Sequence, residues 1–278
     1  MSGSWLAACG DGGTDRGSSS ATTSRHALIA AFPQSVPHIP AGVPTRLPFL
    51  ISDSEGVPLM QIDGKVTFAV TRDGRKLDSV AVAPRSNGAS RAYLPLTFTF
   101  PTSGVYDITA EYDGAKLDAT VQVSEPSEVA VPFVGQRLPA VGSPTVADPL
   151  GVDPICTREP MCPFHEVNLD GAVGSGRPVV LLVASPAYCQ TAVCGPILDI
   201  LMEQAAGRSD LTVIHSEVYK DAKAQPDLST ATLAPVPEAY HLTFEPVLFV
   251  TDRSGTIVAR ADVAVDRDEM KELLALAV

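Results

Sequence analysis

Two cysteines separated by four residues occur in the stretch SPAYCQTAVCGP, residues 185–196. Closely spaced thiols can exchange disulfides, close a structural loop or bind a soft metal ion. In thiol–disulfide exchange, one cysteine of such a pair attacks a substrate disulfide and the other resolves the mixed disulfide that results. This stretch therefore contains the first candidate site of the chain.

The spacing of this pair restricts the local backbone. In a regular helix, residues five apart have Cα atoms about 8.6 Å apart, whereas a disulfide requires Cα atoms within roughly 7 Å. The pair cannot be bridged inside one straight helix. We therefore expect a loop that contains Cys189, with a helix starting near Gly195 and Pro196.

A second pair, Cys156 and Cys162, lies in ICTREPMCPFHEV, residues 155–167. We expect a structural disulfide between these two cysteines, which would close a proline-containing loop. A partial zinc site that includes His165 is an alternative, but the sequence shows no fourth ligand and the spacing is not the usual two to four residues. A third alternative is that Cys156 and Cys162 exchange their disulfide with Cys189 and Cys194.

The first half of the chain is predicted to be a β-sandwich. Seven segments alternate apolar and polar residues in part and are separated by turn-forming sequences, at roughly ten-residue spacing. They are residues 26–32, 45–52, 65–71, 76–83, 91–100, 104–112 and 116–123. The stretch SGVYDITAEYDG resembles the penultimate strand of immunoglobulin-like domains, in which Tyr106 would pack at the sheet corner; Ile108 stands where the family's disulfide has a cysteine.

The last part of the chain alternates strands and helices. The expected strands are 177–185, 211–218, 246–252 and 256–263, and the expected helices are 195–207, 231–243 and 266–277, the last with an acidic N-terminus. This order, with a cysteine pair after the first buried strand, resembles the thioredoxin fold of exported, membrane-anchored thiol–disulfide oxidoreductases. The resemblance implies that Cys189 is the exposed nucleophile, Cys194 the resolving cysteine, and Pro246 a cis-proline beside them that shapes the substrate groove.

Three other functions are compatible with the same cysteines. A thioredoxin-like scaffold would use both pairs as structural disulfides only. A peroxidase would need Ser or Thr three residues before Cys189, where Pro186 stands. A copper chaperone would add His215 or His241 to Cys189 and Cys194.

The N-terminus and the charge indicate where the protein works. The segment Leu6-Ala7-Ala8-Cys9 resembles the bacterial lipobox, so Cys9 is predicted to be lipidated and to anchor the protein to the membrane. A small-residue tether follows it. Disulfides persist outside the cytoplasm, which agrees with an envelope location. A net charge of −12 argues against binding nucleic acid.

Together these observations predict an all-β immunoglobulin-like sandwich followed by an α/β thioredoxin-like domain. The expected divisions are a lipobox remnant and tether (1–25), the sandwich (26–125), a Pro-rich linker with the Cys156/Cys162 loop (126–165) and the thioredoxin-like domain (166–278). The expected function is thiol–disulfide exchange with thiols and disulfides of envelope proteins, with no cofactor and no metal. The alternative is a non-catalytic scaffold lipoprotein.

Overall fold

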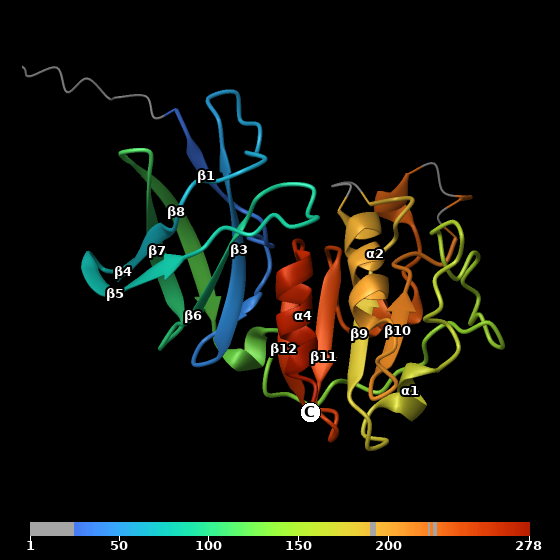
Figure 1. Cartoon of the computed structure of the whole chain (residues 1–278). Coiled ribbons are helices and arrows are strands. Elements are labelled where there is room, and N and C mark those ends of the chain that lie inside the picture. Colours follow the sequence, from blue (N-terminus) through green and yellow to red (C-terminus); the bar gives the residue numbers. More distant parts are fainter. Residues whose placement is uncertain (1–24, 190–192, 222, 225–226) are drawn as a thin grey trace, which may run out of the picture.

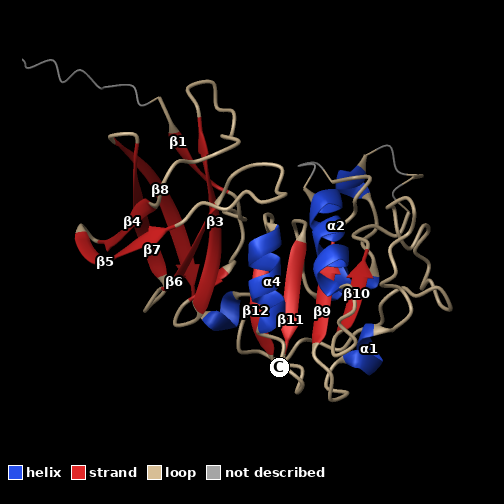
Figure 2. Ribbon diagram, in the orientation of Figure 1, coloured by secondary structure: helices blue, strands red, loops and turns tan. Residues whose placement is uncertain are grey.

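A computed structural model describes residues 25–189, 193–221, 223–224 and 227–278. The described chain forms two parts that lie side by side, with β12 and α4 at the border between them (Figure 1). The first part is built from strands alone and the second from strands and helices (Figure 2). No helix of the described residues has the length and apolar content that a membrane crossing requires.

The first part is a sandwich of two sheets. One sheet has the order β1-β3-β6 and the other the order β2-β8-β7-β4-β5. Their strands are β1 (Ala27–Ala30), β2 (Ile39–Pro40), β3 (Pro44–Ser52), β4 (Val66–Arg72), β5 (Arg75–Val82), β6 (Leu94–Thr99), β7 (Gly104–Tyr112) and β8 (Ala115–Ser124). All seven segments predicted from alternation are strands, and only the two-residue β2 was not predicted.

The sandwich core is formed by the inward-facing residues of both sheets. Phe49 of β3 and Phe68 of β4 meet across the sandwich with ring centroids 5.4 Å apart, and both are fully buried. Tyr106 is also fully buried and its hydroxyl donates to the carbonyl of Thr102 at 2.7 Å. This bond fixes the turn before β7, so the predicted packing of Tyr106 is confirmed.

The second part contains one four-stranded sheet with the order β10-β9-β11-β12, in which β9 and β10 are parallel and the other pairs antiparallel. The strands are β9 (Val179–Val183), β10 (Thr212–Ser216), β11 (Val247–Thr251) and β12 (Ile257–Asp262). The helices are α1 (Leu169–Ala172), α2 (Cys194–Ala205), α3 (Pro235–Ala239) and α4 (Arg267–Ala275), with short 3₁₀ turns at Pro126–Glu128 and Leu228–Thr230. Each strand and helix predicted in residues 166–278 has a counterpart here.

Both faces of this sheet are covered. Along β9, Val180 and Leu182 pack in a core with α2 and α4, while Leu181 packs in a second core on the opposite face. Because β9 is buried on both faces, its sequence is a continuous apolar run. The segment between the two parts also lies against this sheet: Gly135 donates to the Ile257 carbonyl at the β12 edge.

The predicted fold class is wrong. The described chain is mostly β, with twelve strands in three sheets and four short helices of 4, 12, 5 and 9 residues. An α/β thioredoxin-like domain is therefore not assigned. Proline limits the helical content: Pro235 and Pro237 lie within α3, which ends after five residues. Extended chain takes the place of further helix between residues 129 and 168.

A buried ion network joins the two parts. Arg46 of β3 donates to both carboxylate oxygens of Glu269 in α4, at 2.6 and 2.7 Å. His38 lies 3.0 Å from Asp262 of β12, which also pairs with Arg260 at 2.9 Å. Since isolated buried charges are very costly, these pairs make the relative position of the two parts specific.

Candidate functional site

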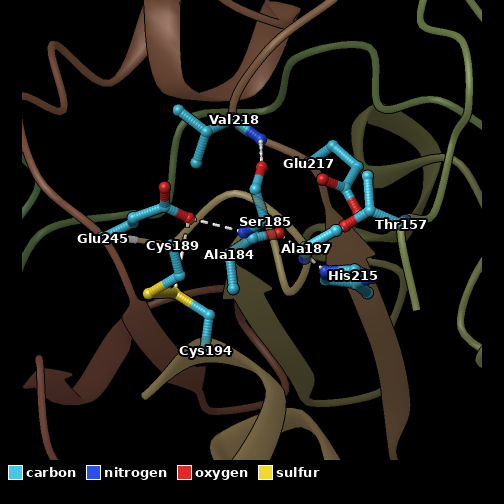
Figure 3. Close-up of a disulfide and its surroundings, with 10 residues drawn as sticks. All are labelled: Thr157, Ala184, Ser185, Ala187, Cys189, Cys194, His215, Glu217, Val218 and Glu245. Carbon is cyan, nitrogen blue, oxygen red and sulfur yellow. Dashed lines mark hydrogen bonds between the residues drawn. A yellow bond between two sulfur atoms is a disulfide. The ribbon is translucent and has the colours of Figure 1, made fainter. Parts of the chain in front are cut away.

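The cysteine pair in residues 185–196 forms a disulfide. Cys189 and Cys194 are bonded with Cα atoms 5.9 Å apart, and α2 begins at Cys194 (Figure 3). The prediction that this pair is bridged only when one cysteine precedes the helix is confirmed. Residues 190–192 lie outside the described part of the chain.

The two sulfurs differ in their exposure. Cys189 is partly exposed, whereas Cys194 is fully buried in the core beneath α2. An incoming thiol or disulfide therefore reaches Cys189 more readily. Both sulfurs lie at the N-terminal end of α2, where the helix dipole favours a thiolate.

Glu245 contacts the buried sulfur. Its Oε2 atom lies 3.4 Å from Cys194 Sγ and accepts a hydrogen bond from the backbone N–H of Ser185 (Figure 3). Burial raises the pKa of Glu245 to about 7, and the nearby Glu217 carboxylate adds to this rise, while the Ser185 bond and His215 oppose it. A carboxyl group with a pKa in this range can gain or lose a proton near neutral pH, and here it lies next to the Cys194 sulfur.

Pro246 follows Glu245, and the peptide bond between them is cis. Pro246 itself is buried, and the preceding residues line the adjacent groove in its place. This groove has a volume of about 840 Å³ and is lined by both parts of the molecule. Phe32 and Leu50 line it from the sandwich, and Val193 and Glu245 from the cysteine side.

A second cluster of titratable groups lies close to the Cys189–Cys194 disulfide. We call it the thiol–imidazole cluster: Cys156, Cys162, His165 and His215. The four ligand atoms all lie within 4.8 Å of one another, and all four side chains are buried. The chain brings three of them from the segment before α1 and the fourth from β10.

The expected disulfide between Cys156 and Cys162 is not formed. Both are free thiols, and their sulfurs face imidazole nitrogens: Cys162 Sγ lies 3.2 Å from His165 Nε2 and 3.4 Å from His215 Nδ1. The contact between the thiols lowers the pKa of Cys156 and, with burial, raises that of Cys162. Burial alone would lower the pKa of His215, but the bond to Cys156 and the charge of Glu217 raise it.

Hydrogen bonds connect the thiol–imidazole cluster to the segment that precedes Cys189. Thr157 donates through its backbone N–H and its hydroxyl to Glu217, and its hydroxyl accepts from the backbone N–H of Ala187. His215 Nε2 donates to the carbonyl of Ala184 at 2.9 Å (Figure 3). The two sites therefore share the backbone that runs from β9 to Cys189.

In the copper-chaperone alternative, His215 or His241 would act with the Cys189/Cys194 pair. His215 instead belongs to the thiol–imidazole cluster, and His241 is exposed and lies in neither group of metal-ligating side chains of the described residues.

Sequence reasoning missed Glu245 altogether. The one indication in the sequence was that Glu245 immediately precedes Pro246, which was expected to lie beside the cysteine pair. Cys9, the predicted lipidation site, lies outside the described residues.

Comparison with known proteins assigns no family. No protein-family model matches the chain, and no curated protein matches it. Among solved structures, an engineered protein shares 20% identity over 36% of this chain with a TM-score of 0.26, and the match spans 20% of that protein. A superoxide reductase (neelaredoxin) from Ignicoccus hospitalis shares 16% identity over 36% of this chain and 81% of its own, with a TM-score of 0.24.

A third solved structure is the PKD domain of the human VPS10 domain-containing receptor SorCS2. It shares 20% identity over 45% of this chain and 98% of its own length, with a TM-score of 0.20. Similarities at this level carry no conclusion about fold or function. The function must therefore be argued from the side chains themselves.

Proposed function

We propose that this protein exchanges disulfides with the thiols and disulfides of other polypeptides through Cys189 and Cys194. The observation that carries the proposal is the environment of the pair: one sulfur is partly exposed, and the other is buried against a carboxyl group whose pKa is near 7. A disulfide with a purely structural role has no need of such a proton carrier. The predicted lipid anchor at Cys9 and an envelope location belong to the same proposal.

The exchange begins from the reduced pair. The Cys189 thiolate attacks one sulfur of a substrate disulfide, forming a mixed disulfide and releasing the other substrate sulfur as a thiolate, which takes a proton from water. Glu245 then accepts the proton of Cys194 through Oε2. The resulting Cys194 thiolate attacks Cys189 Sγ, and the second substrate sulfur leaves as a thiolate that is protonated in turn.

At the end of this sequence the substrate has gained two electrons and the pair is oxidised. An external dithiol returns the pair to the reduced form by the same steps in reverse, in which Glu245 gives its proton back to the departing Cys194 thiolate. The cycle needs no metal or organic cofactor at this pair. The direction of net transfer depends on the reduction potential of the pair relative to its partners.

The groove supports a polypeptide substrate. The groove is mostly apolar, and one of its walls is formed by Val193 and Glu245. Val193 precedes Cys194 in the chain, and Glu245 contacts the Cys194 sulfur. An extended peptide in this groove would lie against Val193 and Glu245, which are the neighbours of Cys194. Such a site favours apolar residues next to the substrate cysteine.

The reduction potential of the pair is the decisive measurement. The full chain is equilibrated in a series of glutathione and dithiothreitol mixtures, thiols are trapped by mass-tagged alkylation, and the modified cysteines are located by peptide mass spectrometry. A midpoint between about −120 and −270 mV, the range of exchange catalysts, is expected. A pair that remains oxidised well below about −300 mV contradicts exchange and supports the scaffold alternative.

A trapping variant tests the order of attack. Cys194→Ser cannot resolve a mixed disulfide, so it should accumulate a covalent adduct with a disulfide-containing peptide at Cys189. The matched control, Cys189→Ser, should form at least tenfold less adduct because its remaining thiol is buried. Equal trapping by the two variants would contradict the assignment of Cys189 as the nucleophile, and stronger trapping by Cys189→Ser would reverse the two roles.

A further inference from the structure

We propose that the thiol–imidazole cluster binds one zinc ion in a closed tetrahedral site. The four ligands are two thiolates and two imidazoles: Cys156, Cys162, His165 and His215. The site is separate from the Cys189/Cys194 pair and does not depend on the function proposed for that pair.

The distances within the cluster match tetrahedral zinc. With Zn–S near 2.3 Å and Zn–N near 2.0–2.1 Å, ligand atoms at tetrahedral angles lie about 3.3 Å apart for two nitrogens and about 3.6 Å apart for sulfur and nitrogen. His215 Nδ1 and His165 Nε2 are 3.3 Å apart. The three sulfur–nitrogen contacts measure 3.2, 3.4 and 3.7 Å. These four separations are close to the tetrahedral values, and all four ligand atoms lie within 4.8 Å of one another, which is the size of site that one zinc ion requires.

The tautomer of His215 is already the one that a metal requires. A carbonyl oxygen can only accept, so the 2.9 Å contact with Ala184 places the His215 proton on Nε2. Nδ1 then carries a free lone pair, and it points at the other three ligands. Ligating histidines are commonly oriented in this way by a hydrogen bond from the second ring nitrogen.

Charge and burial select the metal. The four side chains are at most 7% exposed, so the site has no open position for water or substrate among the described residues. Two thiolates neutralise Zn²⁺, which removes the large cost of burying charge. A monovalent copper ion would leave one uncompensated negative charge, and Mg²⁺ or Ca²⁺ would require oxygen ligands.

Binding is coupled to proton release and to local order. Each thiol that enters as a thiolate releases one proton to solvent, so up to two protons leave per zinc bound from the neutral thiols. The segment 156–165 contains no helix or strand and carries three of the four ligands. Zinc would fix this segment to β10, as structural zinc sites do in regions with few other constraints.

Metal content and spectroscopy test the site. The full chain, purified in the presence of zinc and then desalted, is expected to retain one zinc per chain. Substitution with Co²⁺ should produce the intense visible bands and thiolate charge-transfer absorption of a tetrahedral cobalt site. X-ray absorption of the zinc form should show two sulfurs near 2.3 Å and two nitrogens near 2.0–2.1 Å.

Variants assign the ligands. Cys162→Ser and His215→Gln should each lower zinc affinity at least tenfold, whereas the double variant Cys189→Ser/Cys194→Ser should retain one zinc. Loss of zinc in that double variant would move the site to the redox pair and overturn the proposal. So would oxygen-only coordination or wild-type protein that retains no zinc.

A thiol-protection assay does not depend on the folding of any variant. Wild-type protein with its Cys189–Cys194 disulfide intact is alkylated with and without a chelator. Zinc should slow alkylation of Cys156 and Cys162 at least tenfold, and the chelator should remove this protection. Equal rates in both conditions contradict the site. The reduction potential of the other pair is measured separately, so failure of one proposal leaves the other standing.

Discussion

At the residue scale, the side chain that most changes the chemistry of the disulfide is Glu245. Its carboxyl group lies 3.4 Å from Cys194 Sγ, and burial holds its pKa at about 7. The groups that act on it electrostatically are Glu217 and His215. Burial raises the pKa of Tyr219, and the charge of Glu245 adds to that rise. This carboxyl group links the chemistry of the pair to pH.

Glu245→Gln is expected to change stability in a pH-dependent way. In the unfolded chain a glutamate ionises near pH 4.3, but in the folded protein Glu245 resists ionisation until about pH 7. The stability that protonated Glu245 adds to the folded protein is therefore fully present below pH 4.3 and is lost as pH rises through 7. The neutral Gln variant should melt at a higher temperature than wild type at pH 8 and at nearly the same temperature at pH 5. A variant that melts lower at pH 8 would show that the carboxylate is stabilising.

Sequence reasoning found the sulfurs but not their partners. Cys189 and Cys194 were identified because their spacing is local and can be judged from helix geometry. Glu245 lies 51 residues beyond Cys194, and His215 lies 53 residues beyond Cys162. Such contacts depend on strand order, which no local pattern contains. The Cys156/Cys162 disulfide was expected for the same reason: the short spacing was visible, and His165 was considered only in the zinc alternative, whereas the contact with the distant His215 was not visible.

At the element scale, α4 connects the sheet of the second part with the sandwich. The sequence predicted an acidic N-terminus for this helix, and Asp266 is its N-cap: its Oδ1 accepts from the Glu269 N–H at 2.8 Å. Its other oxygen accepts from the backbone N–H of Asn87 in the sandwich at 3.1 Å. One side chain therefore begins a helix and fixes a loop of the other part.

Asp266→Ala is expected to destabilise the protein by about 1–2 kcal/mol, the upper half of the range for lost N-caps. The reason is that the buried N–H of Glu269 and the part-buried N–H of Asn87 lose their acceptor. Asp266→Asn, which keeps an acceptor oxygen, should recover most of this loss. Denaturant midpoints of the three proteins give the comparison. Equal midpoints for wild type and Asp266→Ala would mean that the cap contributes nothing.

The success of element prediction has a physical basis. Alternation and apolar runs report burial on one or two faces, so strands such as β7 and β9 were located correctly. The short β2 was not predicted because a strand of two residues is too short to show an alternation of apolar and polar side chains. The fold class was wrong because local pattern does not determine how much helix a proline-rich chain forms around a sheet, and here extended segments cover much of it.

At the scale of the whole molecule, the buried ion network fixes the two parts to each other. Arg46 and Glu269 are at most 8% exposed as side chains and bond through two contacts. Burial would raise the pKa of Glu269, but the charge and hydrogen bond of Arg46 outweigh it and lower the pKa. The contribution of the pair is therefore present at neutral pH and is lost as pH falls below about 4.3.

A double-mutant cycle tests this pair. Arg46→Met and Glu269→Gln should each cost about 3–5 kcal/mol at pH 7, because each leaves a buried group unpaired. The double variant should cost clearly less than the sum of the two. Arg208→Ala, which removes the surface pair with Asp210, is the control and should cost less than about 1 kcal/mol. Additive losses would show that the two groups act independently.

The arrangement of the four described cysteines bears on the proposed disulfide exchange. Four thiols permit three pairings, and two of these would cross-link Cys189 and Cys194 to segment 156–165 and stop the proposed exchange. Cys156, Cys162 and Cys194 are 7%, 1% and 0% exposed, and Cys189 alone among the described cysteines is partly exposed. A disulfide that approaches Cys189 is therefore kept apart from the buried thiols of Cys156 and Cys162, which limits cross-linking within the molecule.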